Sequence, residues 1–190
     1  MLGRIALRAF GAVALAGVVI ATTASATQSA PEPEWPSQAA LDHAVIAANL
    51  PDPYAITWEM AHVKGGWWGW TDYDGTGTVT IDPNMPAVEV RDLLLHEWGH
   101  IQMFTVYEGD WQASRAEADA VFGADQGEEY AADCIAVLLG ATSTTVTDCA
   151  DLQHRAAAQL LLDGERLFEP VVPPDQSTSP SGGTASTQRG

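Results

Sequence analysis

The sequence predicts an α+β fold in which a small antiparallel sheet precedes a mostly helical carboxyl-terminal half. Short stretches of strand-like alternation, separated by Gly-Gly and Asp-Gly pairs, occupy residues 55–81 and are typical of β-hairpins. After residue 84 the apolar residues recur at helical spacing and are interrupted at glycines, which indicates several packed helices. The chain of 190 residues suffices for one domain with a buried core.

The first 26 residues have the three parts of a secretory signal peptide. Arg4 and Arg8 give a basic start, residues 10–21 are apolar, and residues 24–26 have the small side chains of a cleavage site. The apolar run is shorter than the roughly 20 residues that cross a membrane. We therefore expect a secreted, extracellular protein with four regions: a signal peptide at 1–26, a flexible lead-in at 27–36, a folded domain at 37–170 and a disordered tail at 171–190.

The chain is strongly acidic, with a formal net charge of −17 at pH 7. Nucleic acids and anionic membranes bind basic patches, so this charge disfavours both as partners. The negative charge of the chain favours neutral or cationic substrates. We expect no nucleic-acid partner, no stable membrane association and a monomeric protein.

The segment before residue 84 is expected to form one helix and three strands. Ser37 can cap a short helix that ends near Leu50. Strands are expected at 55–63, 67–73 and 76–81, with turn-forming glycines between them.

Two features of this segment have alternative interpretations. Residues 72–77 resemble a calcium-binding loop, but Pro83 stands where a bidentate Glu belongs, which favours a plain hairpin turn. Trp67, Trp68 and Trp70 either line a hydrophobic subsite or make core contacts on a half-buried strand.

The remainder is expected to form four helices. The first begins near Asn84 or Pro86, because Asn caps helices well and Pro is tolerated in the first turn. A short helix follows at 114–121, and a third runs over 128–139 until a glycine ends it. The last is expected over 151–168, with an apolar stripe made of Leu152, Ala156, Leu160 and Leu167.

The strongest chemical signal is the stretch His96-Glu97-Trp98-Gly99-His100. Residues four apart lie on one face of a helix, so both imidazoles can bind a single ion. Glu97 follows the first histidine, where a carboxylate can take a proton from a zinc-bound water. The alternative is a core helix with two incidental histidines, which is disfavoured because buried, unpaired histidines are costly.

The third ligand distinguishes two kinds of zinc site. A third histidine at H-x-x-G-x-x-H spacing is missing, because Val106 occupies its position. Glu129 instead lies four residues before Asp133, so both carboxylates share one helical face. Glu129 can then bind zinc while Asp133 accepts a hydrogen bond from a ligand histidine, expected to be His96. Solvated surface charge better explains the competing acidic residues, which are Glu117, Asp119 and Glu128.

Together, HEWGH and EEYAAD resemble the motifs of the gluzincin metallopeptidases, the thermolysin-like class, in a small secreted form. The resemblance covers about residues 57–162 and implies a zincin-like active-site helix. It also implies that the strand at 76–82 is a sheet edge that pairs with bound peptide. The implied roles are Zn²⁺ ligands for His96, His100 and Glu129, general base for Glu97, and histidine-orienting acid for Asp133.

No motif identifies the donor that would stabilise an oxyanion. His154, on the last expected helix, is the first candidate for this catalytic role, followed by Tyr130 and Tyr107. The alternative for His154 is an ordinary surface histidine.

The only two cysteines are Cys134 and Cys149, which we expect to form a disulfide in an exported chain. The alternative is that the thiols bind the metal directly, which is disfavoured because hard ligands are already present and oxidation competes.

The sequence therefore predicts a secreted zinc metallopeptidase that hydrolyses peptide or protein substrates through a zinc-activated water. Two alternatives remain: a non-catalytic, zinc-holding binding or inhibitory domain, and a zinc hydrolase of a non-peptide bond. Glu97 argues against the first, because a structural zinc site needs no base.

Overall fold

The computed structural model describes residues 32–72, 77–123 and 125–168 of the chain. The expected signal peptide, the first half of the lead-in, the tail at 171–190 and the tip of the hairpin turn at 73–76 lie outside these residues. Within them, no helix has the length and apolar character that crossing a membrane requires.

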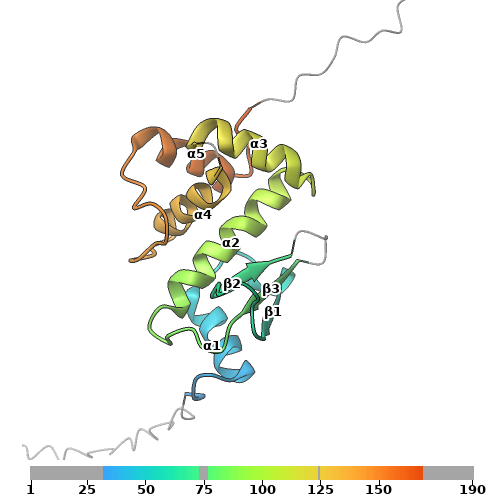
Figure 1. The fold of residues 1–190 in the computed structure, drawn as a ribbon, viewed down its shortest axis with the longest axis vertical. Coiled ribbons are helices and arrows are strands. Elements are labelled where there is room, and N and C mark those ends of the chain that lie inside the picture. Colours follow the sequence, from blue (N-terminus) through green and yellow to red (C-terminus); the bar gives the residue numbers. More distant parts are fainter. Residues whose placement is uncertain (1–31, 73–76, 124, 169–190) are drawn as a thin grey trace, which may run out of the picture. The chain divides into compact units, whose positions relative to one another are not determined.

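The described chain contains five α-helices and three strands, which confirms the α+β fold class. The elements in order are α1 (Gln38–Ala48), β1 (Thr57–Met60), β2 (Gly69–Thr71), β3 (Thr78–Ile81), α2 (Val90–Val106), α3 (Trp111–Phe122), α4 (Gly127–Leu138) and α5 (Leu152–Leu162), with a short 3₁₀ turn at Pro53–Ala55. The long helix α2 lies between the sheet with α1 on one side and the group α3–α5 on the other (Figure 1).

The sheet is mixed, and the expectation of a purely antiparallel sheet was wrong. The strand order is β1-β3-β2, with β2 antiparallel to β3 and β1 parallel to it. The chain between β1 and β2 is too long for a tight hairpin, and Asp82 at the end of β3 fixes its course. One Asp82 carboxylate oxygen accepts the amide N–H of Val63 at 2.9 Å, and the other accepts that of Asn84 at 2.8 Å.

The strand order also moves the sheet edge. The stretch at 76–82 was expected to be an edge, but β3 is the central strand and is paired on both sides. In the described part of the chain, the edge nearest α2 is β2.

Local capping explains where most of the helices begin. The Ser37 hydroxyl accepts the Ala40 amide at 3.2 Å, as expected, and Asp110 and Asp151 cap α3 and α5 in the same way. Helix α2 starts at Val90, later than predicted, because Asn84 binds Asp82 within a turn and is not available as a cap.

Helix α5 is shorter than predicted, and the residues that it buries are not the predicted ones. It ends at Leu162, and Gly164 follows with a φ of 85°. The expected stripe is wrong, because Leu152 is 80% exposed while the buried residues are Ala157, Ala158 and Leu161. Small alanines therefore form the contact with α4, so the two helices can approach closely.

The core is continuous through these elements. Its fully buried large side chains include Val79 and Ile81 from β3, Leu41 from α1, Leu94 and Leu95 from α2, and Ile135 from α4. The sheet and the helices α3–α5 thus pack on opposite sides of the same central helix.

The expected disulfide between Cys134 and Cys149 is present and fully buried. It joins α4 to the end of the loop at 141–149, across a sequence separation of 15.

Removing this disulfide should destabilise the domain mainly by releasing a constraint on the unfolded chain. We expect Cys134→Ala/Cys149→Ala to lower the free energy of unfolding by about 3 kcal/mol, the value for a loop of this length. Urea denaturation of the oxidised wild type and the double variant measures the difference. Equal midpoints and slopes would contradict the expected stabilisation.

Candidate metal centre

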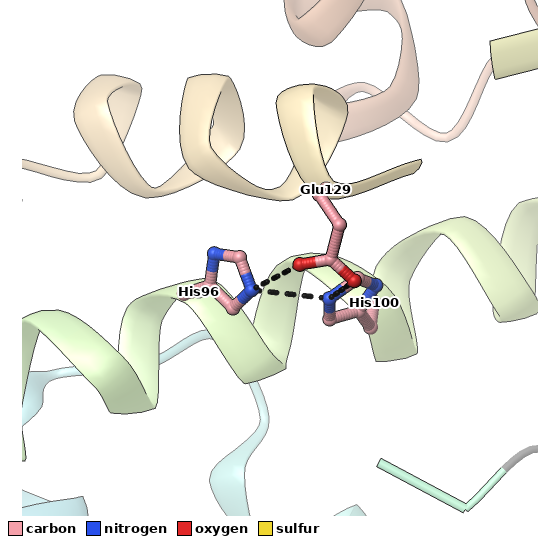
Figure 2. A group of neighbouring side chains, drawn as sticks. All are labelled: His96, His100 and Glu129. Atoms are coloured by element: carbon pink, nitrogen blue, oxygen red, sulfur yellow. Dashed lines mark hydrogen bonds and ion pairs between the residues drawn. The ribbon is translucent and has the colours of Figure 1, made fainter. Parts of the chain in front are cut away.

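Two histidines of α2 share one buried face. His96 is 9% exposed and His100 is 4% exposed, and their Nε2 atoms lie 3.1 Å apart. The one-turn spacing of HEWGH places them there, and the surrounding apolar residues bury the helix. The ring nitrogens therefore converge on one point (Figure 2).

Glu129 approaches this point from α4. Its Oε2 lies 3.3 Å from His96 Nε2 and its Oε1 lies 3.7 Å from His100 Nε2. Gly99, between the two histidines, permits the approach, because a Cβ there would be 3.0 Å from the Ala132 Cα atom. Close contact of α2 and α4 thus brings the carboxylate over the imidazoles (Figure 2).

These three side chains could hold a metal ion, since their donor atoms all lie within 4.8 Å of one another. Ligands about 2.0–2.1 Å from a tetrahedral ion are separated from each other by about 3.3 Å. His96 Nε2 lies 3.1 Å from His100 Nε2 and 3.3 Å from Glu129 Oε2, close to that value, and the other Glu129 oxygen lies 3.7 Å from His100 Nε2. Two imidazole nitrogens from buried histidines and one oxygen from the partly exposed Glu129 are also a donor set that transition metals prefer.

Asp133 holds His96 from behind. Its Oδ1 lies 2.7 Å from His96 Nδ1, as predicted, so the ring must present Nε2 to the Glu129 side. Its Oδ2 accepts three successive backbone N–H groups, those of Thr145, Val146 and Thr147, at 3.1, 2.7 and 3.1 Å. One buried carboxylate therefore orients a candidate ligand and a loop together.

The pKa values reflect this network. Burial lowers the pKa of His96, but its hydrogen bonds to Asp133 and Glu129 outweigh that effect and raise the pKa to about 10. The hydrogen bonds of Glu129 to His100 and His96 lower the pKa of its carboxyl group. The carboxylates of Asp133 and Glu129 thus place negative charge around His96, and binding of a metal ion would release a proton from the imidazole.

Glu97 packs against β2, in contact with Thr71 and Gly69. It is 5% exposed, and its Oε2 accepts the Thr71 hydroxyl at 2.6 Å. It lines the same cavity as the three candidate ligands, a space of about 420 Å³. The structure thus brings together His96, His100, Glu129 and Glu97.

The cavity walls come from the β2 region and from the loop after α4. Trp67, Trp68 and Trp70 line it and are 60%, 43% and 51% exposed, so they are not core residues. Thr145 lines the opposite side. A second cavity of about 380 Å³ shares Trp68, His96 and Thr145 with the first, so the cleft continues past the candidate metal position.

The proposed oxyanion donors lie elsewhere. His154 packs its ring against Phe122, with centroids 5.1 Å apart, and does not line the cavity. Tyr130 forms an edge contact with the same histidine. Tyr107 donates its hydroxyl to Glu117 at 2.7 Å, so it is engaged at the far end of α2.

The competing acidic residues are also accounted for. Glu117 accepts from Tyr107 and pairs with Arg166 at 2.7 Å, while Asp119 accepts the backbone N–H of Gly127 at the start of α4. Glu128 does line the cavity, next to Glu129. It does not belong to the convergent group.

Asp92 was missed as a residue of this site. It accepts the backbone N–H and hydroxyl groups of Thr142 and Ser143, at 2.8–3.0 Å, and so fixes the near end of the loop that carries Thr145. The sequence carries no motif for such a contact, because the partners are about 50 residues apart.

Comparison with protein-family models, with curated proteins and with solved structures gave no match for this chain.

The Asp92 contact should make stability depend on pH. Burial raises the pKa of Asp92, but hydrogen bonds from Thr142 and Ser143 outweigh it and lower the pKa below the ordinary 3.8. Because the folded-state pKa is the lower one, the stabilisation is present above about pH 4 and is lost as pH falls through the folded value. We expect Asp92→Asn to cost about 1–3 kcal/mol at pH 7 and progressively less below pH 4.

Thermal unfolding of wild type and Asp92→Asn between pH 2.5 and pH 7 measures this dependence. The control is Glu165→Gln, which removes an exposed charge after α5 and lines neither cavity. If Asp92→Asn and the control lost stability with the same pH dependence, the Asp92 carboxylate would not be the group that stabilises the fold above pH 4.

The third ligand can be tested by metal content. We expect Glu129→Ala to lose the bound ion on dialysis, while Glu128→Ala, the matched neighbour in the same cavity, retains one ion per chain. Elemental analysis of both variants after equilibration with zinc gives the answer. Loss of metal in Glu128→Ala alone would show that the neighbouring carboxylate is the ligand.

Proposed function

We propose that this protein is a secreted, zinc-dependent metallopeptidase of the gluzincin type, with Glu97 as general base. The observation that carries the proposal is the convergence of His96, His100 and Glu129 at one end of a cavity that Glu97 also lines. A structural metal site has no need of a buried carboxylate beside it, whereas a hydrolytic one does.

Zinc is the proposed ion because of the donors. Two imidazole nitrogens and one carboxylate oxygen are a common protein ligand set of catalytic zinc, which keeps a further position open. The sulfur atoms of the two cysteines are joined in the disulfide and do not compete as ligands. When bound, zinc lowers the pKa of a coordinated water to around 7 and polarises a carbonyl group.

The roles of the side chains follow from their positions. Glu97 takes the proton of the attacking water and later passes it to the leaving amine. Asp133 holds the His96 ring in one tautomer, because its Oδ1 is hydrogen-bonded to Nδ1. Glu129 brings a negative charge that offsets part of the charge of the ion.

The edge strand β2 favours a peptide over other substrates. Backbone hydrogen bonds join Asp72 to Thr78 and Asp82 to Trp68, at 2.9 and 2.8 Å. Since such pairs alternate along an antiparallel ladder, the backbone groups of Gly69 and Thr71 point away from β3, to the open side. An extended peptide could pair with them along the cleft, as in strand addition.

The cleft also extends beyond the candidate metal position. The two adjoining cavities share His96, Trp68 and Thr145. This supports a substrate with chain on both sides of the scissile bond. The exposed tryptophans on its β2 side offer apolar surface to substrate side chains.

Export is part of the proposal. A basic start, an apolar run and small residues near position 26 support a signal peptide, and a buried disulfide supports an oxidising compartment.

Replacement of the base tests the function. We expect wild-type protein loaded with zinc to cleave casein, and a chelator to abolish the cleavage. Glu97→Gln should retain one zinc per chain and lose activity by about 10²- to 10⁴-fold, because general-base catalysis is removed without removing a ligand. The control Glu165→Gln, which lies outside both cavities, should cleave normally.

Two results would overturn the proposal. Undiminished cleavage by Glu97→Gln would refute the assigned base, and a zinc-loaded wild type that cleaves no peptide would favour a non-catalytic metal-holding domain.

A further inference from the structure

The carboxylate of Glu97 is held by two residues of β2 that have no role as metal ligands. Thr71 donates its hydroxyl to Glu97 Oε2 at 2.6 Å, the short distance expected when a hydroxyl binds a charged acceptor. Both side chains are buried, with Thr71 4% and Glu97 5% exposed. Water therefore does not compete strongly for this contact.

Gly69 forms the second contact. A Cβ at this position would lie 2.2 Å from Glu97 Oε1 and 2.8 Å from its Cδ, distances at which atoms overlap. The φ of Gly69 is not among the positive values found for other glycines of the chain, so the backbone conformation does not require glycine. Glycine is needed here for space, because the carboxylate packs directly on the strand.

The two contacts come from one face of one strand. Residues two apart in a strand point to the same side, so the hydrogen at Gly69 and the hydroxyl at Thr71 both face α2. The intervening Trp70 is 51% exposed. Helix α2 and strand β2 are in contact at this place, so the contact fixes the position of the carboxylate between them (Figure 1).

We propose that Thr71 and Gly69 are positioning residues that hold the Glu97 carboxylate in its reactive orientation. The inference rests on the proposed function, since it assigns these residues to the same general base. Thr71 fixes Oε2 by a hydrogen bond, and Gly69 admits the carboxylate by leaving room. Neither residue belongs to the group of candidate metal ligands, so metal binding is expected not to depend on either.

Three variants separate positioning from packing. Thr71→Val keeps the shape of the side chain and removes the hydroxyl, Thr71→Ser keeps the hydroxyl, and Gly69→Ala adds the methyl group that overlaps Glu97. We expect Thr71→Val to lower kcat on the order of 10- to 100-fold, because a hydrogen bond to a charged group is lost. Gly69→Ala should lower it about 100-fold by displacing the base.

The remaining readouts distinguish this role from a structural one. KM, the zinc content per chain and the affinity for zinc should stay at wild-type values in Thr71→Val, and Thr71→Ser should restore kcat to within about threefold of wild type. Crystal structures of Thr71→Val and Gly69→Ala should show the Glu97 carboxylate moved or in more than one orientation.

The outcomes also separate this inference from the function on which it rests. Inactive Glu97→Gln together with fully active Thr71→Val would overturn the positioning role and leave the peptidase. Loss of zinc or a raised KM in Thr71→Val, without rescue by Thr71→Ser, would show that Thr71 acts on the fold. An active Glu97→Gln would overturn both proposals.

Discussion

The buried carboxylate of Asp133 is the contact on which the rest of the site depends. A charge in that position is unfavourable unless it is hydrogen-bonded on all sides, and here one oxygen faces His96 while the other accepts three backbone N–H groups. The same residue therefore joins α2, α4 and the loop after α4. Cys134, its neighbour in sequence, joins that loop again through the disulfide. The orientation of a candidate ligand and the shape of the cleft are consequently set by one group.

Close contacts at two glycines determine how α2 is placed. On the α4 side, Gly99 meets Ala132, and this contact brings Glu129 within 3.7 Å of both imidazoles. On the β2 side, Gly69 meets the Glu97 carboxylate. The helix is thus held between two neighbours at close range, and its metal-facing and base-facing sides are each defined by a residue without a side chain. Packing of this kind fixes the relative positions of the groups to a few tenths of an ångström.

Sequence reasoning succeeded where the interaction is local. The one-turn spacing of His96 and His100, the i,i+4 pair of Glu129 and Asp133, and the caps Ser37 and Asp151 depend on neighbours within one helix. It failed where partners are distant. The parallel pairing of β1 with β3 depends on Asp82 fixing a long connection, and the face of α5 was misjudged because alanines pack there while Leu152 is exposed. His154 was a poor candidate for the same reason, since only the fold shows that it packs against Phe122.

For the secreted peptidase that we propose, the loop at 142–147 has a consequence for resistance to self-digestion. It is polar, lies beside the cleft and would be an obvious point of self-digestion for a peptidase of the proposed kind. To be cut, a segment must become extended and offer its own amide groups to the edge strand of another molecule. Here the amides of residues 142, 143 and 145–147 are already bound to Asp92 and Asp133. Autolysis would first require local unfolding, and the contacts that shape the cleft would thereby also protect it.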